Sequence, residues 1–402
     1  MIAKQAEIEK RDKTPSPSEG DCVYLDHNAT TPVRPEVVDA MIPFLRETYG
    51  NPNSVHSVGQ KARKAVEEAR EEVARLIGAD ADEIVFTSCG SESDVLALTG
   101  AAQNVFNRSS GKKNRIITTV IEHEAMHGAC RCLAARGFKI EKIGVDENAL
   151  VSLDAFKNAL ADDTAVASVM FANNEVGTIQ PIAEIARMCA KAGVLFHSDA
   201  VQAVGKVPID VHALGLDLLS LSGHKINAPK GIGALYVKKG AVLTPVITGH
   251  QEKNRRGGTE NVASIIGLGV AARLIREEFD AHLKKLSCLR DKLEAGVGAL
   301  PGAHRTSRAE NRLPGTSHFC FEGVDGHHLV VALDLEGVCV SSGPACSGGM
   351  TELSHVLKAM NVAPELGRGA LRVTLGWSSS DADIERFLAL LPRTLDKLRT
   401  SQ

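Results

Sequence analysis

Apolar residues form two different patterns along most of this chain. Between Ser57 and Gly78 they recur every three or four positions with charged residues between them, which predicts an amphipathic helix that ends at Gly78. Short continuous apolar runs predict buried strands instead, at residues 83–87, 115–120, 164–171, 194–198, 217–221 and 232–237. Helical stretches at 125–136 and 182–192 lie between these runs. This alternation predicts a mostly parallel sheet with helices on both faces.

The C-terminal part of the chain has a shorter and more mixed pattern. A long helical stretch from Val262 to about Leu300 is followed by predicted strands at 318–321, 338–341 and 371–375, and by helices from 326, 354 and 381. We therefore expect an α/β fold with a large domain at 35–261 and a small α/β domain at 262–402. Residues 1–20 are expected to form a polar tail, and residues 21–34 to pack with the small domain.

Composition and charge narrow the class of protein. The chain has 402 residues, of which 44% are hydrophobic and 24% charged, as in ordinary globular proteins. A net charge of −3 gives no electrostatic reason to expect a nucleic acid or an anionic membrane as partner. The chain has no apolar run of membrane-spanning length and no signal-peptide pattern, and its 9 cysteines are scattered, so we expect a cytoplasmic protein in a reducing compartment.

Polar residues that could take part in catalysis or cofactor binding follow two of the predicted strands. Lys225 comes directly after Ser222-Gly223-His224 at a strand end, where ligands bind in open α/β sheets, and a lysine there suits a Schiff base with a carbonyl cofactor. Asp199 ends the preceding strand, and such a carboxylate can pair with the ring nitrogen of pyridoxal phosphate. Each residue alone also fits a solvated surface lysine or a helix N-cap, so only the set is specific.

Two further turns add candidates for ligand binding. Gly90 and Ser91 open a predicted helix, where free backbone N–H groups can hold a phosphate, although an ordinary N-cap fits equally. Asn174 follows another strand in Asn173-Asn174-Glu175, which also fits a plain Asx turn.

The segment from His123 to His127 matches H-E-x-x-H, the signature of zinc hydrolases. A catalytic zinc site needs a third protein ligand, and the extended pattern fails because Cys130 stands where that pattern has glycine. We therefore expect no metal site here and keep zinc hydrolysis as the competing hypothesis.

Cys346 lies in a segment of glycine and small hydroxyl residues at 341–349. A cysteine in such a loop is expected to be exposed and mobile, as reactive thiols are, and the alternative is a loop cysteine without a role.

Five motifs together resemble the cysteine desulfurases of iron–sulfur cluster assembly, pyridoxal phosphate enzymes with the aspartate aminotransferase fold. They are Y-L-D-H-N-A-T-T-P at 24–32, H-S-D-A-V-Q at 197–202, S-G-H-K at 222–225, R-R-G-G-T-E-N at 255–261 and S-S-G-P-A-C-S at 341–347. Departures from the family pattern are Cys89, Val95 and Pro344, and none of them belongs to the catalytic set.

The resemblance implies a role for each candidate residue. Lys225 would hold the cofactor, His123 would stack on its ring, and Asp199 would bind its ring nitrogen. The phenolic oxygen side would contact Gln202 and Asn174, and the phosphate would contact Gly90, Ser91, Ser222 and His224. Thr259 would reach the phosphate of a neighbouring subunit, which implies a homodimer.

The substrate side follows from the same resemblance. Arg372, with Asn174, would bind the carboxylate of L-cysteine. Cys346 would take the sulfur as a persulfide, pass it to a scaffold or other acceptor protein, and be able to ligate an iron–sulfur cluster transiently. Selenocysteine is an alternative substrate. An aminotransferase leaves Cys346 without a role, and a binding scaffold leaves Lys225 and Asp199 without a purpose.

Overall fold

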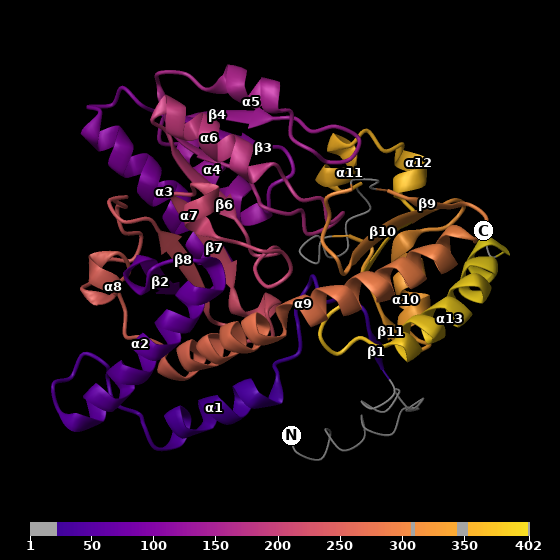
Figure 1. Cartoon of the computed structure of the whole chain (residues 1–402). Coiled ribbons are helices and arrows are strands. Elements are labelled where there is room, and N and C mark those ends of the chain that lie inside the picture. Colours follow the sequence, from indigo (N-terminus) through magenta and orange to yellow (C-terminus); the bar gives the residue numbers. More distant parts are fainter. Residues whose placement is uncertain (1–21, 307–309, 344–352, 401–402) are drawn as a thin grey trace, which may run out of the picture.

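A seven-stranded sheet forms the centre of the larger part of the molecule (Figure 1). The computed structural model describes residues 22–306, 310–343 and 353–400. The strand order is β2-β8-β7-β6-β5-β3-β4. Only β8 runs in the direction opposite to the other six strands, which confirms the prediction of a mostly parallel sheet. The strands are β2 Ile84–Thr87, β3 Arg115–Thr119, β4 Lys139–Ile143, β5 Thr164–Ser168, β6 Leu195–Asp199, β7 Leu218–Ser222 and β8 Gly233–Val237.

Helices cover both faces of this sheet, because its strands are apolar on both sides. In β2, Val85 packs into the core with α3 and α4, whereas the next residue, Phe86, packs into the core with α2 and the long helix α9, Val262–Gly298. The helical elements of this part are α1 Pro35–Arg46, α2 Ser57–Ile77, η2 Ala81–Glu83, α3 Gly90–Arg108, α4 Glu124–Ala134, α5 Leu153–Ala159, α6 Ile182–Ala192, α7 Val211–Leu214, η3 Gly223–Lys225 and α8 Gln251–Asn254. As predicted, α2 ends at Gly78, whose φ of 69° is left-handed.

A three-stranded antiparallel sheet, β12-β10-β9, forms the smaller part. A separate parallel pair joins β1 to β11. The elements here are β1 Val23–Tyr24, β9 Ala303–Arg305, β10 Thr316–Phe321, α10 Gly326–Asp334, β11 Val338–Cys339, α11 His355–Ala359, α12 Pro364–Gly367, β12 Ala370–Thr374 and α13 Asp381–Thr400.

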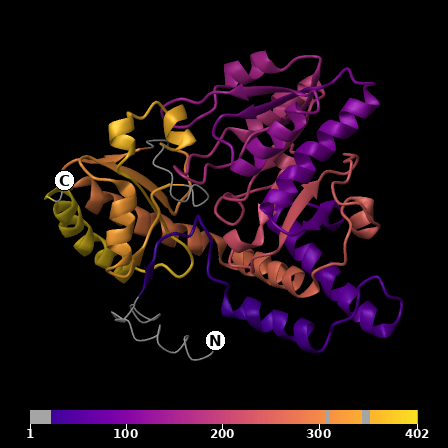
Figure 2. The same ribbon diagram turned by 180° about the vertical axis from the view of Figure 1, so that it is seen from behind.

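The long helix α9, Val262–Gly298, connects the two parts. Its first half contributes Ile265 and Leu268 to the core beneath the large sheet, and its second half contributes Leu289 and Leu293 to the core of the smaller part. The segment between β1 and α1 passes between the two parts, as the reverse view also shows (Figure 2). Among the helices of the described residues, none is long and apolar enough to cross a membrane.

Candidate active site

Three neighbouring parallel strands end at one edge of the large sheet and deliver polar side chains there. Asp199 is the last residue of β6, Ser222 is the last residue of β7, and Asn174 follows β5. The N-terminal segment crosses this edge. The carbonyl oxygen of its Asn28 accepts hydrogen bonds from Lys225 Nζ and from Gln202 Nε2, the latter at 2.9 Å. Residues from distant parts of the chain thus meet where α/β sheets bind ligands.

Lys225 lies in the short helical turn η3 directly after β7. Its half-buried amine also donates to the carbonyl oxygen of Ala29 at 2.7 Å. The turn is tight, because a Cβ on Gly223 would come within 2.7 Å of the Ile232 side chain. Lys225 therefore presents its amine just beyond the end of β7, where the sequence predicts it.

Asp199 lies at the centre of a buried acidic group that also contains Asp94 and Glu122. Burial raises the pKa of Asp199, while the nearby His123 and Lys225 lower it. Burial, and then the charge of Asp199, raise the pKa of Asp94 well above its usual range. Burial also raises the pKa of Glu122 to about 8. Like charges this close cannot all ionise, so burial and mutual repulsion favour the protonated forms of Asp94 and Glu122, whereas the nearby His123 and Lys225 favour the charged form of Asp199.

The start of α3 forms a cradle for an anion. A Cβ on Gly90 would lie 2.6 Å from Val201 Cγ2 and 3.2 Å from Ser222 Cβ, so only glycine fits. Ser222 is buried, and its Oγ has no hydrogen-bond partner among the described residues. Ser91 is exposed at the second position of the helix. Cys89 caps this helix by accepting a hydrogen bond from Glu92 N, and the unpartnered Ser222 hydroxyl beside the first turn of the helix fits the phosphate of pyridoxal phosphate.

His224 comes two residues after Ser222, and a hydrogen bond at 3.1 Å joins its Nδ1 to Thr30 Oγ1 of the N-terminal segment. Burial and the charge of Lys225 lower the pKa of His224 to about 4. The ring is therefore neutral at pH 7 and adds no positive charge of its own.

His123 is the N-cap of α4, where its Nδ1 accepts a hydrogen bond from Ala125 N at 3.2 Å. This bond fixes the ring at the edge of the acidic group. His127 lies one turn further on, buried against the ring of His355 with ring centroids 5.4 Å apart. Burial lowers the pKa of His127 to about 4.

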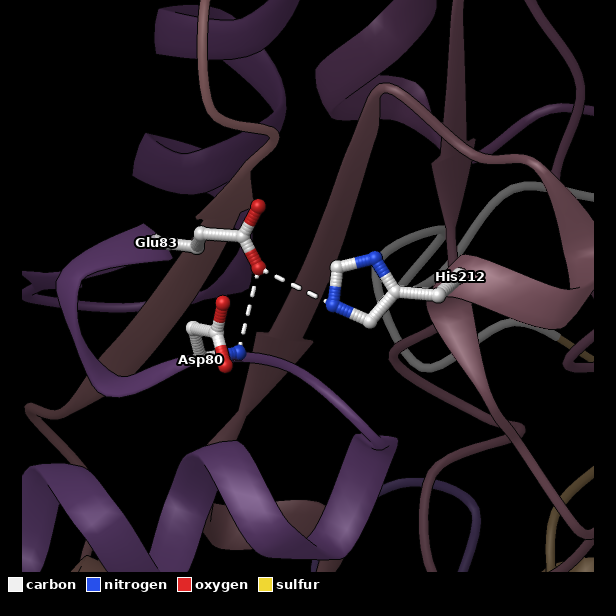
Figure 3. A group of neighbouring side chains, drawn as sticks. All are labelled: Asp80, Glu83 and His212. Atoms are coloured by element: carbon white, nitrogen blue, oxygen red, sulfur yellow. Dashed lines mark hydrogen bonds and ion pairs between the residues drawn. The ribbon is translucent and has the colours of Figure 1, made fainter.

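Within the described ranges, the one group of three potential metal ligands is Asp80, Glu83 and His212 (Figure 3). Neither histidine of the H-E-x-x-H motif, His123 or His127, belongs to this group. In that group Glu83 Oε2 accepts a hydrogen bond from Asp80 N at 3.1 Å and lies 3.3 Å from His212 Nε2. The carboxylate of Glu83 caps a helical turn, and these contacts account for the group without an ion.

Two sets of residues form the walls of the site. The strand ends of the large sheet with Lys225 form one wall, and Arg372, in β12 of the smaller part, forms the opposite wall. Its side chain is 1% exposed and donates from one terminal nitrogen to Asp26 Oδ1 at 2.8 Å and from the other to the carbonyl oxygen of Asn174 at 3.0 Å. Its Nε has no partner among the described residues. A buried guanidinium with a spare donor fits a carboxylate ligand.

Cys346 lies outside the described residues, within 344–352, but both flanks of that segment are at the site. On one side, Ser341 exchanges two backbone hydrogen bonds with Arg372. On the other side, Ser354 Oγ donates to Glu175 Oε2 at 2.6 Å, and His355 Nε2 lies 3.1 Å from the carbonyl oxygen of Glu122. The two ends of the segment with Cys346 therefore lie at the two walls.

Lys206 is a site residue that pattern reasoning misses. Its half-buried amine donates to Gln202 Oε1 at 2.8 Å and to Asn28 Oδ1 at 3.1 Å. Burial, and then the charges of Lys225 and Arg372, lower its pKa to about 7. Its position four residues after Gln202 is the one signal in the sequence. Thr259, in contrast, is exposed, and it lines a pocket of about 230 Å³ that also contains Ser88.

Comparisons with known proteins agree with this geometry. The model of the family "Aminotransferase class-V" matches residues 23–387. The chain is 45% identical to the cysteine desulfurase NifS of Azotobacter vinelandii over 94% of this chain and 93% of that protein. It is 47% identical to the cysteine desulfurase IscS of Dictyoglomus turgidum over 94% and 95% of the two chains.

Solved structures show the same likeness. A NifS-like protein superposes with a TM-score of 0.87 at 38% identity, covering 94% of this chain and all of that one. SspA in complex with cysteine superposes with a TM-score of 0.78 at 33% identity, covering 88% of this chain and 98% of that one. The chain therefore belongs to the class-V aminotransferase family, and within it to the cysteine desulfurases, which use pyridoxal 5′-phosphate.

Proposed function

We propose that this protein converts L-cysteine to L-alanine and takes the sulfur onto Cys346 as a persulfide, for delivery to iron–sulfur cluster assembly. One observation carries this proposal. The segment that contains Cys346 starts beside Arg372 and ends beside Glu175, so its two ends lie at a carboxylate-binding wall and at a lysine-bearing wall. An aminotransferase needs both walls but has no use for a cysteine in that segment.

The large-sheet wall holds the cofactor. Pyridoxal phosphate supplies an electron sink when bound. Lys225 would hold the cofactor through its amine, and the same amine is placed to move the proton at Cα of the substrate. The Asp199 carboxylate would hold a proton on the ring nitrogen, and the raised pKa values of Asp94 and Glu122 favour leaving the negative charge on Asp199. His123 would stack on the ring, and its Nδ1 already accepts a hydrogen bond from Ala125 N.

Gln202 and Lys206 orient the polar edge of the cofactor site. The Lys206 amine donates to Gln202 Oε1, and the Gln202 amide donates to the Asn28 carbonyl oxygen. In this orientation the amide nitrogen of Gln202 would also face the phenolic oxygen of a bound cofactor. Asn174, Ser91, Ser222 and His224 complete the polar contacts.

Arg372 binds and orients the substrate carboxylate. Its terminal nitrogens already have partners, so the spare Nε gives the carboxylate a preferred side of approach. The carboxylate then replaces or shares the Asp26 contact. Since the guanidinium is 1% exposed, water competes little with the ligand.

Cys346 accepts the sulfur as a thiolate. Its sulfur attacks the sulfur of the substrate, a new S–S bond forms, the substrate C–S bond breaks, and the electron pair of that bond returns to the carbon, which takes up a proton to become alanine. In the sequence, Cys346 comes five residues after Ser341, the residue that is anchored to Arg372. A fully extended chain of that length spans at most about 17 Å, which limits how far the thiol can lie from the carboxylate-binding wall.

The decisive experiment is mass spectrometry of the pure protein after incubation with L-cysteine. We expect one added sulfur on the Cys346 peptide and one alanine per sulfur. A parallel incubation with selenocysteine compares the alternative substrate. A keto acid product with an unmodified Cys346 would identify an aminotransferase and contradict the proposal.

We also propose a homodimer with shared active sites, in which Thr259 contacts the cofactor phosphate of the second copy. Large apolar side chains at Leu45, Tyr49 and Val55 are 67%, 79% and 92% exposed, and Val246 and Ile247 are exposed near the segment with Thr259. A second copy of the chain would cover them. Subunits carrying Lys225→Ala and Thr259→Ala should regain activity when mixed and exchanged, whereas activity no higher than the average of the two parents contradicts sharing.

We further propose a large domain at 35–261 and a small domain at 262–402, with residues 21–34 on the small domain. The separate hydrophobic cores and the packing of Val23 and Leu25 into the smaller core support this division, although α9 contributes to both cores.

A cytoplasmic location fits the free thiols, and a scaffold or other acceptor protein would take the sulfur.

A further inference from the structure

Two free thiols that the proposed reaction does not use lie in contact on the smaller part of the molecule. Cys22 is exposed, Cys339 is half-buried, and their sulfur atoms are 3.3 Å apart. The two residues are separated by 317 positions in the chain. Only the pairing of β1 with β11 brings them together.

The strand register explains this contact. β1 and β11 are parallel, with Tyr24 opposite Cys339. Side chains alternate between the faces of a strand, so Cys22, two residues before Tyr24, points to the same side as Cys339. Backbone hydrogen bonds from Val23 N to Gly337 O and from Leu25 N to Cys339 O, both 2.9 Å, hold the register. An S–S bond of about 2.0 Å needs the two sulfur atoms to approach by about 1.3 Å, and Cys22, which precedes β1, is the residue whose backbone has to shift.

We propose that Cys22 and Cys339 form a redox-active dithiol that closes to an intramolecular disulfide when it meets a low-molecular-weight disulfide, RSSR. The Cys22 thiolate attacks RSSR, forms a mixed disulfide and releases one RS⁻. Cys339 then gives up its proton to solvent, and its sulfur attacks the Cys22 sulfur and expels the second RS⁻. The pair is oxidised by two electrons, and RSSR is reduced to two thiols.

The surroundings assign the order of the two steps. Cys339 Sγ donates a hydrogen bond to Asp334 Oδ1 at 3.7 Å, and burial, with the adjacent Cys22, raises the pKa of Cys339 to about 12. Cys22 is open to solvent and therefore attacks first, while Cys339 resolves the mixed disulfide. In the described part of the chain, no third metal ligand joins the two sulfurs in a group of three.

The bridge would join the two segments that hold Arg372. β1 continues to Asp26, which accepts a hydrogen bond from Arg372, and β11 continues to Ser341, which exchanges backbone hydrogen bonds with Arg372. A covalent link between β1 and β11 restricts the unfolded chain, and we expect the oxidised protein to melt a few degrees higher than the reduced one.

The test uses the cofactor-loaded Cys346→Ser protein, so that the loop thiol does not compete, in mixtures of oxidised and reduced glutathione. We expect peptide mapping without reductant to find a Cys22–Cys339 cross-link, with a rise in melting temperature that reductant reverses. The Cys22→Ser variant should lose the cross-link, and the Cys339→Ser variant should keep glutathione on Cys22. Cys288→Ser, which removes another exposed thiol, is the matched control and should leave the cross-link intact.

Three results would overturn the proposal. They are a stable glutathione adduct on Cys22 with Cys339 still reduced, a cross-link that joins either residue to a different cysteine, and the absence of any reaction at both thiols. The mapping is made on the native pair, so it does not depend on how well the serine variants fold. Because the readout is not turnover, it also stands apart from the proposed desulfurase activity.

Discussion

The two walls of the active site are built in opposite ways. On the large sheet, Asp199, Ser222 and Lys225 lie at or just beyond strand ends, where the backbone is free to turn and side chains reach a ligand. On the smaller sheet, Arg372 lies within β12 and is held by the carboxylate of Asp26. The first wall therefore suits chemistry on a cofactor, and the second suits fixed recognition of one substrate group.

A single segment of the N-terminus touches both walls. Asp26 binds Arg372, and two residues later the Asn28 carbonyl accepts hydrogen bonds from Lys225 and Gln202. Substitutions in the large-sheet wall should therefore remove cofactor chemistry. Substitutions at Arg372 should instead weaken substrate binding and leave the cofactor in place. Four substitutions test this distinction.

Lys225→Ala should have the largest effect, because in the proposed function Lys225 both attaches the cofactor and moves the Cα proton. We expect turnover to fall by at least about 10³-fold. The measurement is alanine release, together with the visible absorption of the purified protein. A variant with an unchanged visible band and near-normal turnover would show that another residue holds the cofactor. Lys191→Ala, at an exposed lysine on α6, is the control.

Arg372→Lys should reduce kcat/KM by about 10- to 100-fold, since one charge-assisted hydrogen bond contributes about 1.5–3 kcal/mol. The change should lie mainly in KM. The visible spectrum without substrate should match that of the native protein, which also checks that the variant folds. A normal KM with a lost visible band would place Arg372 on the cofactor wall instead.

Lys206→Met should have a smaller effect, because it acts through Gln202. It leaves Gln202 Oε1 and Asn28 Oδ1 without their donor, and we expect about a tenfold loss of kcat. Burial lowers the pKa of Lys206 to about 7, so the variant should also lose an inflection near that pH in the profile of kcat/KM. An unchanged pH profile with reduced thermal stability alone would make Lys206 purely structural.

Glu122→Gln should change stability more than activity. Burial raises the pKa of Glu122 to about 8, above its unfolded value of about 4.3, so its protonated form favours the folded state. That contribution is fully present below the unfolded pKa and is lost as pH rises through 8. The melting temperature of the variant, relative to the native protein, should therefore increase between pH 5 and about pH 8. A constant difference across this range would mean that Glu122 is already ionised.

Several parts of the fold follow from the sequence because they depend on neighbouring residues. The α2 helix and its end at Gly78 follow from a local period and a local backbone requirement, and the apolar runs locate six strands of the large sheet. β4 is not predicted, because Lys139 and Lys142 interrupt its apolar pattern. Its edge position in the sheet, exposed to water, permits those lysines.

The sequence by itself also determined which residues carry the proposed chemistry, since Asp199, Ser222 and Lys225 follow recognisable strands and belong to specific motifs. Only the tertiary structure decided how these groups are held. The low pKa of Lys206 and the high pKa of Glu122 come from burial beside residues that are distant in the chain. The contact of Cys22 with Cys339 arises from the pairing of two short strands. A local pattern reports the period of one segment, whereas burial and pairing depend on every segment that packs against it.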